Sequence, residues 1–293
     1  MTKQEFIALA KQRALILDGA TGSNLRKAGM PVGVCSELWA LEHPEAVLAL
    51  QRAYVDAGSD ILYAPTFTAN RVNLTGFGLE DRLVEINTEL VKLSKQAANG
   101  RALVAGDITT TGKVLEPKGD MSYQELFDIY AEQIRVLADA GADLIVAETM
   151  LTLEETTVAL EAAQAVCDLP VMCSLTLEAD GNLLYGGTVV EAFEALQELG
   201  AAAVGLNCSV GPNQLESVVS AMKSVAKIPV IAKPNAGMPM MDEHGVAHYD
   251  MPPAEFAACM KKLLWRGARI VGGCCGTDPE YIRELCGVVR GNA

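Results

Sequence analysis

The chain has 293 residues, of which 50% are hydrophobic and 20% charged, enough for a large core in one or two domains. Asp and Glu outnumber Lys and Arg by 37 to 23, the formal net charge is -14, and no basic block could follow a nucleic-acid backbone. The N-terminus lacks the apolar segment of a secretory signal, and no apolar run approaches the about 18 residues of a membrane span. We therefore expect a cytoplasmic protein that binds neither nucleic acid nor membrane.

Eight short apolar runs follow one another along the chain, and each ends in a turn signal ahead of a stretch with helical periodicity. They cover residues 14–22, 60–68, 102–110, 143–151, 170–178, 202–212, 229–237 and 269–277. Unbroken apolarity, as opposed to alternation, is typical of strands buried on both faces of a parallel sheet. The pattern predicts an α/β fold, a single (β/α)8 TIM barrel that spans residues 1–293 as one domain. A doubly wound sheet is the alternative.

The segments between these runs carry signals for crossover helices. Capping boxes predict helix starts at Ser122 with Glu125, Thr152 with Glu155, Thr188 with Glu191 and Thr277 with Glu280, and Gly58, Gly141, Gly200 and Gly267 predict helix ends. No G-x-G-x-x-G follows the first run and no G-x-x-x-x-G-K occurs, which argues against a nucleotide-phosphate loop. The three histidines, His43, His244 and His248, fall in helix or loop context, and we assign them no catalytic role.

Polar residues end each predicted strand, where barrel enzymes place their reactive groups. In chain order they are Asp18, Thr66, Asp107, Glu148, Thr176, Cys208, Asn235 and the pair Cys274 and Cys275. Polar strand ends also occur in purely structural positions, because Asp and Thr begin loops and helices well. Three thiols at two nearby strand ends are harder to explain in that way.

These three thiols suggest a zinc site. Only one strand separates Cys208 from Cys274 and Cys275, and zinc takes sulfur ligands in a tetrahedron with one position left open in catalytic sites. Adjacent residues of a strand face opposite sides, so the glycines around the pair would have to supply the backbone freedom that aims both sulfurs at one ion. These glycines are Gly272, Gly273 and Gly276. A buried thiol pair and a vicinal disulfide are the alternatives.

Four segments resemble the homocysteine S-methyltransferase family, most closely the homocysteine-binding module of cobalamin-dependent methionine synthases. They are DGATGSNL at 18–25, GLNCSVGP at 205–212, PNAG at 234–237 and GGCCGT at 272–277. The resemblance covers nearly the whole chain and implies a barrel in which Cys208, Cys274 and Cys275 hold zinc while the homocysteine sulfur takes the open position.

The resemblance also implies substrate contacts. Asp18 and the backbone of Gly19 and Ala20 would lie near the amino-acid end of homocysteine, Glu148 would meet its ammonium group, and Asn235 would lie beside the metal. One segment departs from the family, which commonly has Thr-Asn-Thr-Phe where residues 64–67 read APTF. Thr66 is kept as a candidate contact, whereas Pro65 removes a side-chain amide and a backbone donor.

The implied activity is transfer of a methyl group to homocysteine, giving methionine. Zinc would hold the substrate as a thiolate, which attacks the methyl group directly, so no residue is assigned as a catalytic base. The expected donor is methylcobalamin on a separate corrinoid protein, and S-methylmethionine or betaine are the alternatives. A barrel with structural zinc and a binding role, and a hydrolase or lyase with Glu148 as base, remain open as other classes.

Overall fold

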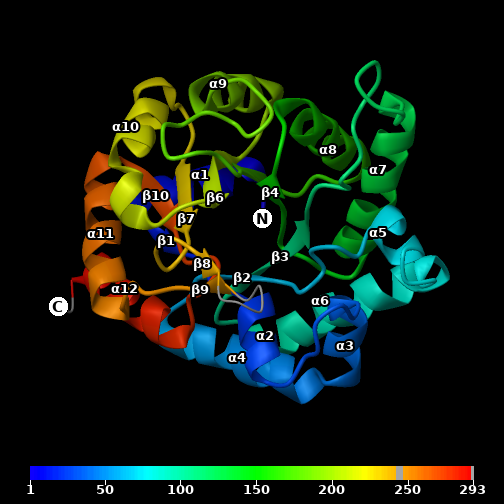
Figure 1. Cartoon of the computed structure of the whole chain (residues 1–293), viewed down its shortest axis with the longest axis horizontal. Coiled ribbons are helices and arrows are strands. Elements are labelled where there is room, and N and C mark those ends of the chain that lie inside the picture. Colours follow the sequence, from blue (N-terminus) through cyan, green and yellow to red (C-terminus); the bar gives the residue numbers. More distant parts are fainter. Residues whose placement is uncertain (242–246, 292–293) are drawn as a thin grey trace.

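A computed structural model of the chain describes residues 1–241 and 247–291, so His244 lies outside the described residues. Eight parallel strands form one sheet in the order β1-β10-β7-β6-β5-β4-β3-β2, and a bridge between Leu17 and Ile61 joins its two edges. The predicted (β/α)8 TIM barrel is confirmed, as the ring of strands and helices in Figure 1 shows. The strands are β1 Leu15–Ile16, β2 Ile61–Tyr63, β3 Leu103–Ile108, β4 Leu144–Met150, β5 Val171–Leu175, β6 Ala203–Cys208, β7 Val230–Pro234 and β10 Ala268–Val271.

Helices surround the sheet, and two short strands, β8 Met240–Met241 and β9 Ala247–His248, form a separate antiparallel pair that the sequence did not predict. The helices are α1 Lys3–Gln12, α2 Gly22–Lys27, α3 Ser36–Glu42, α4 Pro44–Ala57, α5 Arg71–Thr75, α6 Leu83–Ala98, α7 Tyr123–Asp139, α8 Leu153–Val166, α9 Val189–Leu199, α10 Glu216–Val225, α11 Pro253–Arg266 and α12 Pro279–Arg290, with 3-10 turns at Glu80–Arg82 and Pro212–Gln214. None of the helices in the described ranges is both long enough and apolar enough to span a membrane.

The predicted helix starts are confirmed in part. Ser122 and Thr188 form complete capping boxes, whereas Thr152 caps α8 without a return bond from Glu155. The predicted box at Thr277 is wrong, because Asp278 caps α12 by accepting from the backbone N–H of Glu280. The hydroxyl of Thr277 instead donates to the carbonyl of Cys274, so this residue supports the cysteine turn and not the helix.

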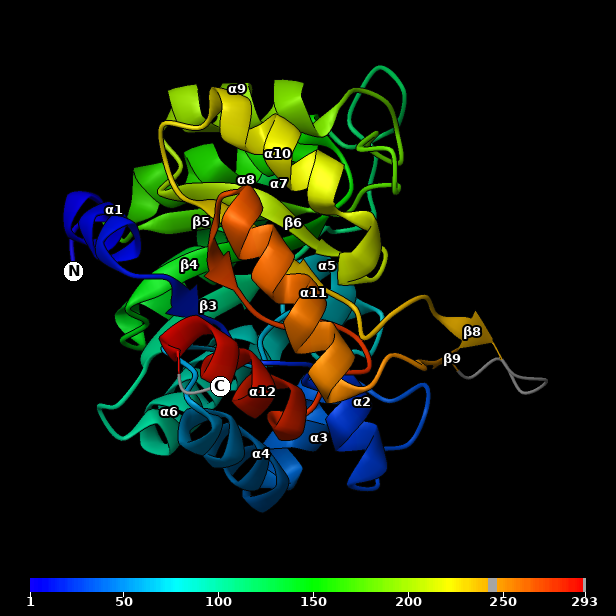
Figure 2. The same cartoon turned by 90° about the vertical axis from the view of Figure 1, so that its left-hand side faces the viewer.

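The core has one layer inside the barrel and another between the strands and the helices. Inside, side chains of the strands pack with Phe6 and Ala10 of α1, which closes the N-terminal end of the barrel. Figure 2 shows α1 at one end of the molecule and the β8–β9 pair at the opposite end, where the parallel strands finish. A site built from strand ends must therefore lie at the end away from α1.

Candidate functional site

The structure brings the three predicted metal ligands together. The Sγ atoms of Cys208, Cys274 and Cys275 all lie within 4.8 Å of one another, and those of Cys208 and Cys275 are 3.8 Å apart. Two sulfurs about 2.3 Å from a tetrahedral zinc ion would be about 3.8 Å apart, so the donor set fits zinc with one position left open. All eight cysteines are free thiols, and hydrogen bonds from Cys208 and Cys274 lower the pKa of Cys275.

Local backbone geometry aims these sulfurs inward. Cys208 ends β6 with a φ of 58°, in the left-handed region that few non-glycine residues adopt. Strand β10 already ends at Val271, so Cys274 and Cys275 lie in a turn where strand alternation no longer applies. The turn is tied to the end of β7, because Cys274 N–H donates to the carbonyl of Pro234 at 2.7 Å.

The glycines of this turn serve two purposes, only one of which the sequence predicted. Gly276 has a φ of 83° and supplies the expected backbone freedom. Gly272 and Gly273 are needed for space, since an added Cβ would lie 2.6 Å from the Cβ of Leu17 and 2.5 Å from Oγ1 of Thr277, respectively. Close packing, more than unusual dihedral angles, therefore explains this part of the glycine cluster.

A cavity of about 350 Å³ opens beside the sulfur atoms. Of the predicted substrate contacts, Asp18, Gly19, Ala20 and Glu148 line it together with the three cysteines. Its other lining residues are Thr21, Gly22, Ser23, Leu25, Ser36, Glu37, Tyr63, Ala64, Pro65, Phe67, Asp107, Thr149 and Lys233. The thiol cluster and the predicted amino-acid contacts thus share one space.

Thr66 and Asn235 do not line this cavity. The hydroxyl of Thr66 donates to the carbonyl of Asp107 at 2.8 Å and accepts from the N–H of the same residue at 3.1 Å. The side-chain amide of Asn235 donates to the carbonyl of Ser209 at 3.3 Å. Both side chains hold the backbone beside residues of the site.

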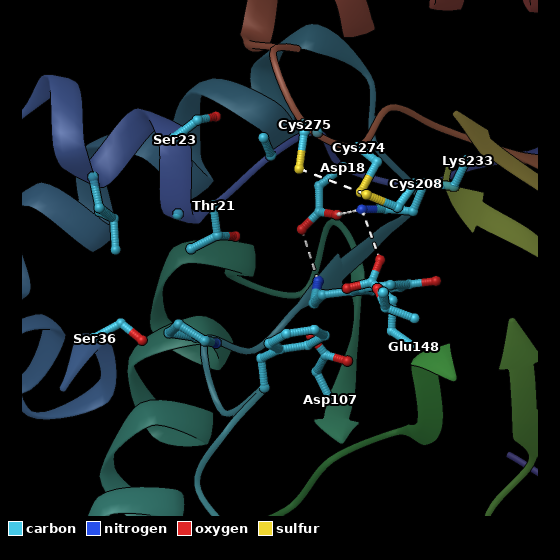
Figure 3. Close-up of a pocket in the computed structure, with 18 of the residues that line it drawn as sticks. Asp18, Thr21, Ser23, Ser36, Asp107, Glu148, Cys208, Lys233, Cys274 and Cys275 are labelled. Atoms are coloured by element: carbon cyan, nitrogen blue, oxygen red, sulfur yellow. Dashed lines mark hydrogen bonds and ion pairs between the residues drawn. The ribbon is translucent and has the colours of Figure 1, made fainter. Parts of the chain in front are cut away.

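Lys233 is a central residue of the cavity that the sequence interpretation missed. Its side chain extends from β7 into the barrel, and its Nζ lies 3.1 Å from Oε1 of Glu148, 3.9 Å from Oδ1 of Asp18 and 4.8 Å from the centre of the Tyr63 ring (Figure 3). Only 3% of the residue is exposed. A lysine inside the apolar run 229–237 was the available signal, because such a run predicts burial on both faces.

Three carboxyl groups surround this ammonium group. Burial raises the pKa of Asp18 to about 7, against the opposing effects of Lys233 and of the N–H that Tyr63 donates to its Oδ2. Burial also raises the pKa values of Asp107 and Glu148, again opposed by Lys233. Among the described residues, Oδ1 of Asp18 and Oδ1 of Asp107 are buried without a hydrogen-bond donor. The cavity therefore offers unused acceptors to a cationic ligand group.

Two mycobacterial proteins match almost the whole chain. A methionine synthase of Mycobacterium leprae (strain TN) is 30% identical over 296 residues, which are 95% of this chain and 24% of that protein. A methionine synthase of Mycobacterium tuberculosis (strain ATCC 25618 / H37Rv) is 29% identical over 303 residues, 97% of this chain and 25% of that protein. The chain spans about a quarter of the length of these curated relatives.

Solved structures share the fold. The homocysteine methyltransferase MmuM of Escherichia coli superposes in its oxidized form with a TM-score of 0.80 at 21% identity, over 98% of both chains. Its metallated form gives 0.78 at 21% identity, over 95% of this chain and 97% of the other. The model of the homocysteine S-methyltransferase family matches residues 15–289. Because this match runs from β1 into α12, the chain belongs to the homocysteine S-methyltransferase family.

Proposed function

We propose that this chain, as one domain over residues 1–293, transfers a methyl group to the sulfur of homocysteine, and that Cys208, Cys274 and Cys275 hold zinc. The observation that carries the proposal is that three clustered sulfurs and the predicted amino-acid contacts line the same cavity. Zinc bound by these sulfurs would lower the pKa of a substrate thiol in the fourth position, so that the thiolate is present near neutral pH.

The chain's own residues would bind and orient the amino-acid end of the acceptor. Glu148, Asp18 and Asp107 supply buried acceptors for its ammonium group, and Lys233 holds the first two in place. Gly19 and Ala20 form the cavity wall beside Asp18. These groups fix the acceptor at one end, so that its sulfur lies at the cysteine cluster.

Thr66 and Asn235 take supporting roles in this proposal. Thr66 would hold the backbone of Asp107, and Asn235 would hold Ser209 next to Cys208. Direct substrate contact by these two residues is not needed.

For the donor, we propose methylcobalamin carried by a separate corrinoid protein. The support is that the methionine synthases match 95–97% of the chain at 29–30% identity, whereas MmuM matches at 21%. Homocysteine assays with methylcobalamin, S-methylmethionine and betaine would decide among the donors. We expect turnover with methylcobalamin and none with the other two.

Free thiols at the site would require a reducing compartment, which is consistent with a cytoplasmic location.

The zinc assignment is tested by replacing one ligand. The purified chain should contain about one zinc ion, and Cys208→Ser should lose both metal and methyl transfer because two sulfurs bind zinc far more weakly. Cys173→Ala is the matched control, since Cys173 is buried in the outer core layer away from the cavity, and it should keep both. Full zinc occupancy and normal turnover in Cys208→Ser would contradict the proposal.

The structural-zinc alternative predicts a different response of the metal to substrate. In the cobalt-substituted protein, homocysteine should change the thiolate-to-cobalt absorption if the fourth position is open. An unchanged spectrum at saturating homocysteine would favour a closed, structural site.

A further inference from the structure

The side-chain amide of Asn207 connects the sulfur cluster to the carboxylate end of the site. Asn207 precedes Cys208 in β6 and is completely buried. Its Oδ1 accepts from the N–H of Thr149 and from the hydroxyl of Ser174, both at 2.8 Å. Its Nδ2 donates to Oγ1 of Thr149 at 2.6 Å and to Sγ of Cys274 at 3.8 Å. Both ends of the amide are therefore engaged.

Thr149 needs such support because its backbone is unfavourable. It has a φ of 55°, which is a rare and costly conformation for a β-branched residue. The register between β4 and β5 shifts from Ala147 to Met150, so Thr149 and Glu148 form a bulge. Bulges re-aim side chains, and here the residue that lines the cavity and meets Lys233 is Glu148. By bonding Thr149 twice, Asn207 stabilises the bulge that directs Glu148 inward.

The same amide touches the sulfur cluster. Its N–H group points to Cys274, which lies on a turn far from β4 in the sequence. A donor on a thiolate sulfur restrains the direction of that ligand and stabilises its negative charge, and groups behind metal ligands commonly tune metal affinity in this way. Asn207 itself does not line the cavity, so it acts through its neighbours.

We propose that Asn207 is a positioning residue that sets the geometry between the sulfur cluster and Glu148. In the proposed function, the sulfur cluster and Glu148 would hold the two ends of homocysteine. The part of the inference that concerns homocysteine therefore rests on that function. The effect on Cys274 concerns metal binding alone. It can therefore be measured without any acceptor.

The Asn207→Asp variant tests this role in the full chain. Aspartate keeps an oxygen for Thr149 and Ser174, and the hydroxyl of Thr149 can turn to donate to the second oxygen. The contact with Cys274 changes from attraction to repulsion when the aspartate is ionised. We expect zinc affinity, measured by competition with a chromophoric chelator, to fall about ten- to hundred-fold. Asn207→Ser removes the donor without adding charge and should lower affinity in the same direction.

Ser174→Ala is the matched control, because it removes a hydrogen bond to the same amide but has no contact with sulfur. Its zinc affinity should equal that of the unaltered protein, while urea unfolding should show that Asn207→Asp, Asn207→Ser and Ser174→Ala are all folded. Equal zinc affinity in folded Asn207→Asp and the unaltered protein would overturn the role of Asn207. If the unaltered protein held zinc but failed to bind homocysteine, the proposed function would be wrong, and the zinc comparison would still decide the role of Asn207.

Discussion

At the scale of single residues, the site concentrates ionisable groups in buried positions. Asp18, Asp107, Glu148 and Lys233 are all buried, and an isolated buried charge is very costly. Burial alone would lower the pKa of Lys233, but Glu148, Cys274 and Asp18 raise it well above its usual value. The ammonium group therefore stays charged, and its charge favours the ionised forms of Asp18, Asp107 and Glu148.

Removing this ammonium group should destabilise the fold strongly. Lys233→Met leaves Glu148 and Asp18 without their cation, and breaking one partner of a buried pair costs about 3–5 kcal/mol. The double variant Lys233→Met with Glu148→Gln also removes the charge of Glu148, which Lys233→Met leaves unpaired. It should therefore recover part of the free energy of unfolding that Lys233→Met loses. Urea unfolding measures both effects, and a single variant as stable as the unaltered protein would show that the pair contributes little.

The buried carboxyl of Asp18 predicts a pH dependence of stability. Its pKa rises on folding from 3.8 to about 7, so the folded state binds this proton more tightly than the unfolded state does. The stabilisation is fully present below pH 3.8 and is lost as the pH rises through about 7. Asp18→Asn keeps an acceptor for the Tyr63 N–H but cannot ionise. Its free energy of unfolding should therefore fall less than that of the unaltered protein across this window, and parallel pH curves would refute the assignment.

At the scale of elements, the turn at residues 272–277 determines where two of the three sulfurs lie. Oγ1 of Thr277 donates to the carbonyl of Cys274 at 2.7 Å and accepts from the N–H of Ala20 at 3.2 Å. The turn after β10 is thereby joined to the loop after β1. Packing between these loops, and not the strands alone, holds the cysteines over the cavity.

The Gly273→Ala variant tests this packing. The new Cβ would meet Oγ1 of Thr277 at 2.5 Å, so the turn must shift, which should lower zinc affinity and cost about 1–3 kcal/mol of stability. Gly287→Ala is the control, because Gly287 lies inside α12 and, apart from its chain neighbours and the backbone of that helix, no atom lies within 4 Å of the added Cβ. It should leave zinc binding unchanged and stabilise the helix by up to about 1 kcal/mol. Unchanged zinc affinity in Gly273→Ala would show that the turn tolerates the shift.

At the scale of the whole molecule, the barrel separates stability from chemistry. Its N-terminal end is closed by α1, whose Phe6 is fully buried among strand side chains, while the site lies at the opposite end. Residues at the closed end should therefore affect unfolding without affecting metal binding.

Phe6→Ala tests that separation. The cavity it leaves should lower the free energy of unfolding by about 3–5 kcal/mol, measured in urea, with no change in zinc content of the folded protein. The exposed Gln4 lies on the same helix, and Gln4→Ala should change neither quantity. Loss of zinc from folded Phe6→Ala would mean that the two ends of the barrel are coupled.

Much of this molecule could be predicted from local patterns. The eight apolar runs identified the barrel strands, because a strand buried on both faces needs apolar side chains at every position. The order of the strands then placed Cys208 near Cys274 and Cys275. The roles of Lys233 and Asn207 could not be predicted, since a lone polar residue in a strand does not reveal which distant strands supply its partners.

The barrel, the identity of the three clustered thiols and the approximate position of the carboxylates follow from strand periodicity and strand order, which can be read along the chain. Which side chains share the cavity depends on how the closed barrel packs. This packing places Lys233 between Asp18 and Glu148, turns Thr66 and Asn235 toward the backbone, and joins Thr149 to Cys274 through Asn207. These contacts could not be predicted because hydrogen bonds and ion pairs form between strands far apart in the chain, and their geometry depends on bulges and turns that are fixed only when the barrel closes.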